Sequence, residues 1–294
     1  MATKENRAAY NRPLMTSASL GCTTARRRVI EANGVRLHFL DAGIAGAPVL
    51  LFLHGGAAHA HWFDAVTPTF SDRYHAVSLD QRGHGQSEWP RPPAYATTDF
   101  AADLLALLDI EGWRRVVLIG HSMGGHNALS FSAWHPERVQ ALVVVDSRPA
   151  IPDDRLTLMH QRGERPLRFH PTLADAVAAF RLLPRETVAD RALLAHMAEQ
   201  GVMQRDGGWV YRFDPASNRD RQPVDAWTLL HRITAPTLIV RGEFSPVLPR
   251  PMAERIRQAI PNSSLIEIPG AYHHLVLDAP AAFADALDAF LARL

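Results

Sequence analysis

The stretch Gly120-His121-Ser122-Met123-Gly124-Gly125 decides the fold of this chain. It directly follows the apolar run at 116–119 and opens a segment with helical character at 123–134. These neighbours predict a buried strand, a sharp turn and a helix. Side chains two places before and after the serine would collide on such a turn, and glycine at both places removes the collision. The pattern is therefore typical of an elbow that presents the Ser122 hydroxyl at one edge of a sheet.

Apolar runs of strand length alternate with helix-period segments on both sides of the elbow. Asn33-Gly34 predicts a two-residue hairpin turn between strands at 29–32 and 35–40, because both central residues of that turn take positive φ. Further strands are predicted at 49–53, 75–79, 139–145, 237–240 and 264–268, and helices at 98–110, 251–260 and 280–294. This alternation indicates an α/β fold: a mostly parallel sheet with helices on both faces.

The alternation of apolar strands and helices stops between residues 147 and 235. This segment holds 13 arginines and 11 carboxylates, with helix-like stretches at 173–183 and 189–200 and no apolar strand. We therefore predict three parts: a flexible N-terminal tail at 1–27, an α/β core at 28–146 and 236–294, and a helical cap at 147–235. The cap is expected to lie over one end of the sheet.

Composition excludes several functional classes. The 31 basic and 30 acidic side chains leave a formal net charge of +1, which gives no basic face for nucleic acid. The single cysteine, Cys22, excludes an internal disulfide framework, and Lys4 is the only lysine, so no core lysine serves a phosphate loop or a Schiff base. No apolar run reaches the roughly 20 residues of a membrane span. We expect a cytoplasmic enzyme with a small-molecule substrate; a homodimer is compatible with the sequence.

Acyl transfer at Ser122 needs donors for the oxyanion and a histidine oriented by a carboxylate. The loop Leu53-His54-Gly55-Gly56 follows an earlier buried strand, and glycine lets its backbone approach a substrate oxygen. We predict that the N–H groups of Gly56 and Met123 form the oxyanion hole. His54 is expected to bond loop backbone.

With these features the chain resembles the α/β-hydrolase superfamily over about residues 28–294. The motifs that carry the resemblance are His54-Gly55-Gly56, Asp80-Gln81-Arg82-Gly83-His84-Gly85-Gln86-Ser87, the elbow, and Pro269-Gly270-Ala271-Tyr272-His273 followed by Pro280. The resemblance implies Ser122 as nucleophile, His273 as general base, a structural role for His84, and no cofactor. The neighbouring His274 remains an alternative base.

The acid departs from the family pattern. Superfamily members commonly carry it in a stretch similar to Arg241-Gly242-Glu243-Phe244-Ser245-Pro246, but the expected aspartate is Pro246 here. Asp146 ends the strand that follows the elbow strand, so it should emerge at the same sheet edge as Ser122. Some esterases and one branch of haloalkane dehalogenases place their acid there. We favour Asp146 and keep Glu243 as its rival.

Other residues are weaker candidates for substrate contacts. We predict that His61 and Trp62 line the pocket beside the oxyanion loop, that His121 lies within it, and that Trp209 forms part of its wall. Arg148 is expected at the cavity mouth, where it can pair with an acidic substrate. The run from His59 to Asp64 resembles a His-x-His metal motif, but its spacing does not suit a dinuclear hydrolase, so no metal is predicted.

These features lead to a cofactor-independent serine hydrolase, with a carboxylic ester as the first expectation. Serine at 122 excludes the halide- and epoxide-cleaving branches, which resemble this chain but need aspartate there. Val145-Asp146 and Arg241-Gly242-Glu243 are also similar to an amidohydrolase of the acetamidomethylene-succinate type, so amide cleavage is one alternative. Carbon–carbon bond hydrolysis and a non-enzymatic ligand receptor on the same fold are the others.

Overall fold

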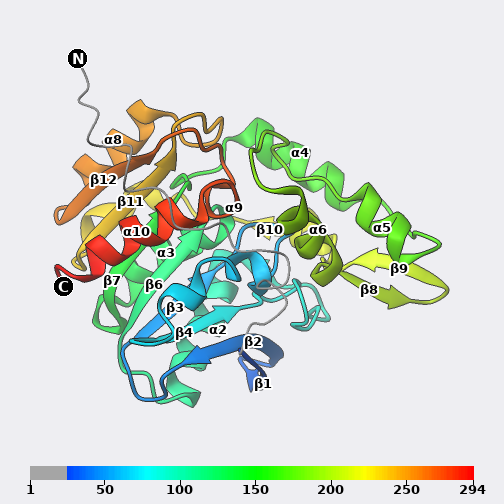
Figure 1. Ribbon diagram of the computed structural model, residues 1–294, viewed down its shortest axis with the longest axis horizontal. Helices are drawn as coiled ribbons and strands as arrows, with labels where there is room; N and C mark the ends of the chain where they lie inside the picture. The colour runs from blue at the N-terminus through cyan, green and yellow to red at the C-terminus, as the bar shows by residue number, and fades with distance from the viewer. Residues whose placement is uncertain (1–24) are drawn as a thin grey trace.

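Eight strands form one mixed sheet in the order β1-β2-β4-β3-β6-β7-β11-β12 in the computed structural model, which describes residues 25–294 (Figure 1). The strands from β4 to β12 pair in parallel, whereas β2 is antiparallel to both β1 and β4. Their bounds are Arg26–Ala32 (β1), Val35–Gly43 (β2), Val49–Leu53 (β3), His75–Leu79 (β4), Val116–His121 (β6), Val139–Val145 (β7), Thr237–Gly242 (β11) and Ser263–Ile268 (β12). The predicted fold class is confirmed.

The hairpin at the start of the sheet forms as the sequence predicts. Ala32 pairs with Val35, and the two residues between them, Asn33 and Gly34, have φ of 50° and 74°. Strand β1 begins at Arg26, so the core starts two residues before the predicted boundary. Residues 1–24 of the predicted flexible tail, with Cys22 among them, lie outside the described residues.

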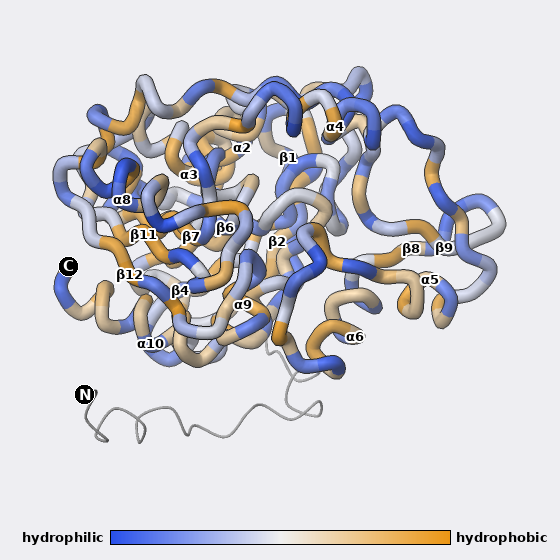
Figure 2. The backbone as a smooth tube through the Cα atoms, turned by 90° about the horizontal axis from the view of Figure 1, so that it is seen from above, coloured by the Kyte–Doolittle hydropathy of each residue, from blue (hydrophilic) through white to orange (hydrophobic). Residues whose placement is uncertain are grey.

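Each face of the sheet is buried under its own layer of helices. Strand β3 alternates between the layers: Leu51 and Leu53 join the cluster with helices α2, α3 and α8, while Leu50 and Phe52 join the cluster with α9, α10 and η2. The bounds are Thr97–Ile110 (α2), Met123–Trp134 (α3), Arg250–Ala259 (α8), Leu275–Asp278 (α9), Pro280–Leu291 (α10) and Ala60–Phe63 (η2, a 3-10 helix). Hydrophobic colour concentrates on the inner strands such as β6 (Figure 2). This two-sided burial is what a parallel sheet requires.

The segment between β7 and β11 holds more than the predicted helices. Its elements are α4 (Asp153–Gly163), α5 (Leu173–Ala179), α6 (Arg191–Gln200), β8 (Val202–Arg205), β9 (Gly208–Tyr211), α7 (Ala216–Arg219), β10 (Arg221–Gln222), η5 (Ala226–Thr228) and η6 (Leu230–Arg232). Strands β8 and β9 form an antiparallel hairpin, and β10 pairs with β5 (Tyr95–Ala96), so the expectation of no strand here is wrong. The predicted helix at 173–183 ends early because Phe180 takes an extended conformation. We call residues 147–235 the insertion.

Short 3-10 turns complete the described chain at Thr67–Thr69 (η3) and Pro136–Arg138 (η4). None of the helices in the described range has both the length and the hydropathy of a bilayer span.

Candidate active site

Ser122 lies on the sharp turn between β6 and α3. Its backbone has φ of 52° and ψ of −116°, a strained conformation for a residue with a side chain. A methyl group on Gly120 would overlap the carbonyl of Gly124, and one on Gly124 would overlap the carbonyl of Leu53. The steric reason for both glycines is therefore as expected: they let the elbow bend tightly against the neighbouring strand end.

A continuous hydrogen-bonded relay joins three of the predicted residues. His273, in the loop between β12 and α9, has its Nε2 3.1 Å from Ser122 Oγ and its Nδ1 2.9 Å from Asp146 Oδ1. Nδ1 faces a carboxylate, so it carries the ring proton, and Nε2 accepts from the serine hydroxyl. His273 and Asp146 are both buried. The arrangement can remove a proton from Ser122 as its oxygen attacks an electrophile.

Asp146 reaches His273 because β7 neighbours the elbow strand in the sheet. Its backbone N–H donates to the Val240 carbonyl at 2.7 Å, which fixes the strand end. Its Oδ2 accepts from the Gly242 N–H at 2.9 Å, and its Oδ1 accepts from Ser245 Oγ at 2.5 Å as well as from His273. The carboxylate therefore has three fixed donors.

Glu243, the rival acid, is exposed and points elsewhere. Its Oε2 accepts from the backbone N–H of Gly270 at 2.8 Å. This bond ties the loop after β11 to the loop after β12. Of the two candidate carboxylates, the structure brings only Asp146 to His273.

Ser245 is a residue of the site that sequence reasoning did not single out. It precedes Pro246, which occupies the usual position of the acid. Its hydroxyl donates to Asp146 and accepts from the N–H groups of Val247 and Leu248, each at 3.1 Å. The loop that normally supplies the carboxylate thus supplies a hydroxyl that holds the carboxylate of the neighbouring strand.

We predict that Ser245→Ala lowers kcat about 10- to 100-fold, since a hydrogen bond to a charged group contributes roughly 1.5–3 kcal/mol and Asp146 keeps its other donors. Losing this donor releases one of the three bonds that hold the carboxylate against His273, so the loss should appear in kcat with little change in KM. Ser245→Thr keeps the hydroxyl and should restore kcat. An unchanged kcat in Ser245→Ala would contradict this role.

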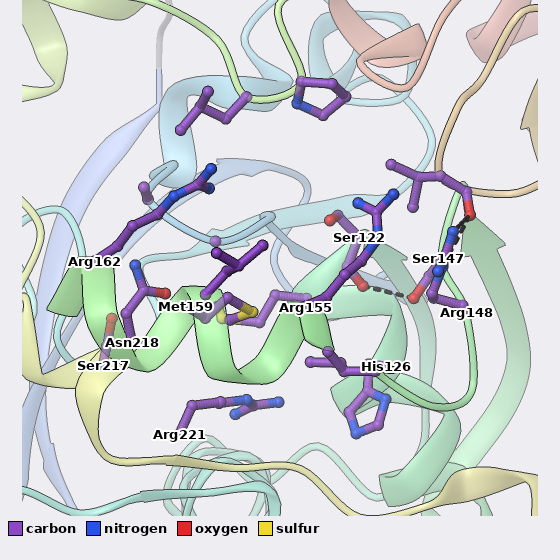
Figure 3. Close-up of a pocket in the computed structure, with 18 of the residues that line it drawn as sticks. Ser122, His126, Ser147, Arg148, Arg155, Met159, Arg162, Ser217, Asn218 and Arg221 are labelled. Atoms are coloured by element: carbon purple, nitrogen blue, oxygen red, sulfur yellow. Dashed lines mark hydrogen bonds between the residues drawn. The ribbon is translucent and has the colours of Figure 1, made fainter. Parts of the chain in front are cut away.

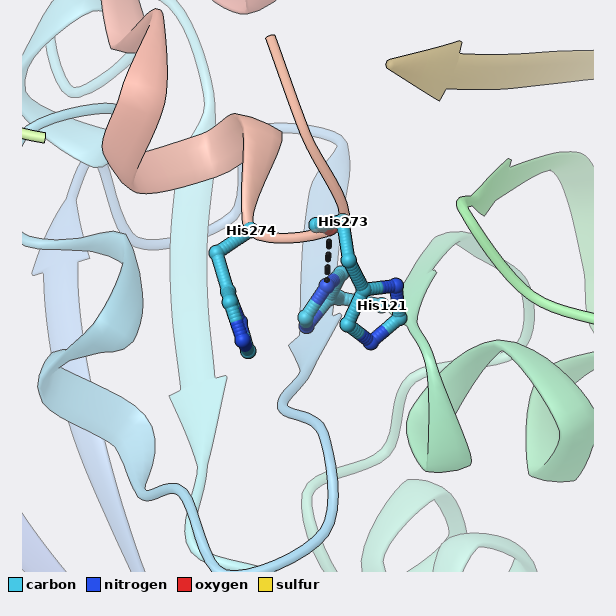
Figure 4. A group of neighbouring side chains, drawn as sticks. All are labelled: His121, His273 and His274. Carbon is cyan, nitrogen blue, oxygen red and sulfur yellow. Dashed lines mark hydrogen bonds between the residues drawn. The ribbon is translucent and has the colours of Figure 1, made fainter. Parts of the chain in front are cut away.

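Two further histidines pack against His273 (Figure 4). His121 Nε2 donates to the His273 carbonyl at 3.0 Å, and His274 Nε2 donates to the Pro184 carbonyl at 3.1 Å. Burial lowers the pKa of His121 well below its ordinary value and that of His274 to about 3, so both are neutral at pH 7. The geometry therefore selects His273, and not His274, as the partner of Ser122. The three rings lie close enough to hold a metal, but both nitrogens of His273 are engaged in the relay.

The two predicted oxyanion donors lie side by side at the nucleophile. Met123 is the first residue of α3, where backbone N–H groups have no partner within the helix. A methyl group on Gly56 would lie 4.0 Å from Cβ and Sδ of Met123, and both residues line the same cavity as Ser122. Two backbone donors beside the serine suit a developing negative charge on oxygen.

A cavity of about 600 Å³ opens in front of Ser122 and is walled by both the core and the insertion (Figure 3). Core loops contribute Gly56, Ser122, Met123 and His273, and helix α4 crosses the opposite wall. Residues of the insertion that line it include Ser147, Arg148, Ile151, Asp154, Arg155, Leu158, Met159, Arg162, Ser217, Asn218 and Arg221. Its size suits a small organic molecule.

The structure separates the predicted substrate contacts into two groups. Arg148 lines the cavity, although its Nε donates to the Val247 carbonyl at 2.9 Å. His121 lies behind His273, and neither it nor Trp209 is among the cavity-lining residues. Trp209 instead pairs through its backbone with His170. The expectation that these two residues contact substrate is corrected accordingly.

His61 and Trp62 also lie away from the cavity. They belong to η2, which packs against the sheet face that carries α10, and both are buried there. Trp62 stacks edge-on with Phe180 of the insertion. His54 bonds loop backbone as predicted: its Nδ1 donates to Gly55 O at 2.7 Å and its Nε2 accepts from the Gln81 N–H at 3.0 Å. His84 also bonds backbone but lines the cavity as well.

A histidine–aspartate–histidine group joins η2 to the insertion. Asp64 Oδ2 accepts from His61 Nδ1 and from His196 Nε2 of α6, each at 2.8 Å. Burial alone raises the pKa of Asp64, but the hydrogen bonds from His196 and His61 outweigh it, and the net pKa lies below the ordinary 3.8. Asp64 therefore stabilises the fold in its charged form.

We predict that Asp64→Asn lowers the free energy of unfolding by about 2 kcal/mol near pH 7. Because the folded-state pKa is depressed, the contribution is present above the unfolded value near 3.8 and fades as pH falls through the folded pKa. Urea unfolding of both proteins from pH 7 down to pH 2 measures the difference. A difference that stays constant over this range would show that charge on Asp64 is not the cause.

Comparisons with known proteins bear on the fold and the family of the chain. The family described as alpha/beta hydrolase fold matches residues 48–280. A 2-(acetamidomethylene)succinate hydrolase of Mesorhizobium japonicum is 27% identical over 84% of this chain and 88% of its own length. A 2-hydroxy-6-oxo-6-(2'-aminophenyl)hexa-2,4-dienoic acid hydrolase of Metapseudomonas resinovorans is 28% identical over 90% of this chain and 91% of its own.

The solved structures give the same picture. The crystal structure of an E-2-(acetamidomethylene)succinate hydrolase superposes with a TM-score of 0.82 at 25% identity, covering 91% of this chain and 99% of that one. The match extends over the core and into the insertion, and both sequence relatives are named as hydrolases. The chain belongs to the α/β-hydrolase fold family.

Proposed function

We propose that this protein is a serine hydrolase that cleaves an amide-type acyl bond of a small molecule through an acyl-enzyme at Ser122. The observation that carries the proposal is the relay from Asp146 through His273 to Ser122 at the floor of the cavity. We choose an amide over the ester first expected because the chain is similar to the 2-(acetamidomethylene)succinate hydrolase, whose named substrate carries an acetamido group. This similarity covers 88% of the length of that protein.

The mechanism follows from the positions of the groups. His273 Nε2 takes the hydroxyl proton while Ser122 Oγ attacks the substrate carbonyl, and the N–H groups of Gly56 and Met123 stabilise the tetrahedral oxyanion. Each such donor is typically worth about 3–4 kcal/mol in kcat. His273 then protonates the leaving nitrogen as the C–N bond breaks. Water attacks the acyl-enzyme with His273 again as base, which releases the acid and restores Ser122.

The insertion acts as a cap in this proposal. Helix α4 and the residues after it cover the side of the cavity opposite Ser122, so the substrate is enclosed between cap and core. Exclusion of bulk water strengthens the interaction of the backbone donors with the oxyanion. Epoxide opening through an aspartate nucleophile has no counterpart here, because serine occupies the elbow.

Carbon–carbon bond hydrolysis is the second candidate. It is favoured by the similarity to the hexadienoic acid hydrolase, which also spans about nine-tenths of both chains. The same relay serves both reactions. They differ in the atom of the leaving group that must receive a proton: nitrogen when an amide is cleaved, and carbon when a diene ketone is cleaved.

A fluorophosphonate probe and a substrate panel test the proposal. We expect a single covalent adduct on Ser122 by intact and peptide mass spectrometry, and faster turnover of small N-acyl compounds than of a vinylogous diketone such as a hydroxy-oxo-dienoate. Faster diketone turnover would favour the second candidate. Labelling at another residue, or tight ligand binding with no turnover of either class, would contradict the proposal and support a receptor.

A further inference from the structure

Arg221 is a fully buried arginine in the cavity wall with no ion-pair partner among the described residues. It is 2% exposed and belongs to β10. One Nη donates to Asn127 Oδ1 at 2.9 Å, and the other makes a long contact of 3.5 Å with the Tyr95 carbonyl. Its Nε has no hydrogen-bond partner. A buried guanidinium ordinarily has a carboxylate beside it, because an uncompensated charge is costly away from water.

The charge at Arg221 remains in spite of its burial. Burial lowers its pKa to about 10, which still leaves it protonated at pH 7. The carboxylate of Asp99 opposes this lowering of the pKa. The guanidinium stacks over the Phe100 ring at 4.8 Å, and its Nε stays without a hydrogen-bond partner. The cavity as a whole is also positive: its walls carry Arg148, Arg155 and Arg162 against one carboxylate, Asp154.

The position of Arg221 relative to the nucleophile is set by α3. Its partner Asn127 is five residues beyond Ser122 on that helix, a rise of about 7.5 Å at 1.5 Å per residue. Figure 3 shows Arg221 and His126, the residue before Asn127, in the same part of the cavity wall. A substrate held at both Ser122 and Arg221 therefore needs a chain between its two ends, and the length of that chain is the quantity that the probes below measure.

We propose that Arg221 binds a carboxylate carried by the substrate at the end remote from the scissile carbonyl. The substrate class is then a small acyl compound with a second, anionic end. The two oxygens of a carboxylate match the planar guanidinium, and phosphate is the alternative that the test below separates from it. The proposal rests on the proposed function, because it takes Ser122 as the reacting end.

A series of activated acyl compounds of matched shape tests this site. The probes are the mono-p-nitrophenyl esters of glutarate, adipate and pimelate, each compared with its neutral carbamoyl analogue, in which a primary amide replaces the free carboxylate. We expect the wild type to prefer the carboxylate form in kcat/KM, most strongly at one chain length. In Arg221→Gln this preference should fall 10- to 100-fold.

Matched variants make the result interpretable. Arg219→Gln, two residues away, removes an exposed arginine that is paired with Asp220 and lies outside the cavity wall, so it should keep the preference. Arg221→Lys keeps the charge without the planar fork, so it should lose part of the preference; it also carries the test if Arg221→Gln does not fold. Circular dichroism and fluorophosphonate labelling report on folding and on Ser122.

The outcomes separate this proposal from the proposed function. If Arg221→Gln is labelled normally and keeps the carboxylate preference, Arg221 is structural and the proposal is wrong. If inorganic phosphate slows labelling and adipate does not, the assignment to a carboxylate is wrong. If the wild type is neither labelled nor active, the proposed function fails, and calorimetric binding of adipate, expected to weaken 10- to 100-fold in Arg221→Gln, decides the anion site independently.

Discussion

Replacing Ser122 by alanine should abolish turnover, with kcat falling by about 10⁴- to 10⁶-fold on any substrate that the wild type accepts. The elbow backbone is held by bonds that do not involve the hydroxyl, including the Ser122 N–H to Val145 O at 3.0 Å. The variant should therefore fold normally and still bind substrate. What it loses is the covalent step, since His273 Nε2 bonds to no other hydroxyl among the described residues. Steady-state kinetics and loss of fluorophosphonate labelling measure the effect.

Ser217→Ala is the matched control. Ser217 is a buried serine that lines the same cavity but makes no side-chain contact with His273 or Asp146 among the described hydrogen bonds. It should keep kcat within a few-fold of the wild type and be labelled at the same rate. If the two variants lose activity equally, the cavity wall and not the Ser122 hydroxyl would be responsible.

The sheet is the part of the fold that sequence reasoning predicts best. Strands β3 and β7 have the predicted bounds, because every residue of β3 and nearly every residue of β7 is buried on both faces and reads as a continuous apolar run. The hairpin β8–β9 in the insertion is not predicted. Its signal is present: Asp206-Gly207 is a two-residue turn with φ of 34° and 90° between short strands. The polar residues of β8 conceal it.

Some residues of the site can be predicted from the sequence, and others cannot. Ser122 and His273 follow from local motifs, and Asp146 follows from strand order, because neighbouring parallel strands end at one sheet edge. The structure brings these three together as predicted, and their catalytic roles remain proposals. Ser245 and His196 have no local signal: Ser245 matters only because it faces Asp146, and His196 meets Asp64 from 132 residues away. Arg221 is distinctive because it is buried with no carboxylate in ion-pair contact among residues 25–294, which a sequence cannot show.

Replacing Asp146 by asparagine should lower kcat by about 10⁴-fold while leaving the fold intact. The carboxylate accepts from Gly242 on one oxygen and from Ser245 and His273 on the other, but an amide has one oxygen. If that oxygen stays with the Gly242 N–H, the amide nitrogen faces His273 and forces Nδ1 to become an acceptor. The ring proton then moves to Nε2. A protonated Nε2 can no longer accept the proton of Ser122. Kinetics and a thermal melt separate this loss from unfolding.

Glu243→Gln is the control that decides between the two carboxylates. Its amide oxygen can keep the bond to the Gly270 N–H, so both activity and melting temperature should stay near wild type. If Asp146 is the acid, only Asp146→Asn loses activity; if Glu243 is the acid, only Glu243→Gln does. Each variant replaces one carboxylate by its amide in the same region. A 10⁴-fold loss in Glu243→Gln with an active Asp146→Asn would mean that the acid moves to the loop after β11 during turnover. The buried bonds that fix Asp146 from three sides argue for the opposite result.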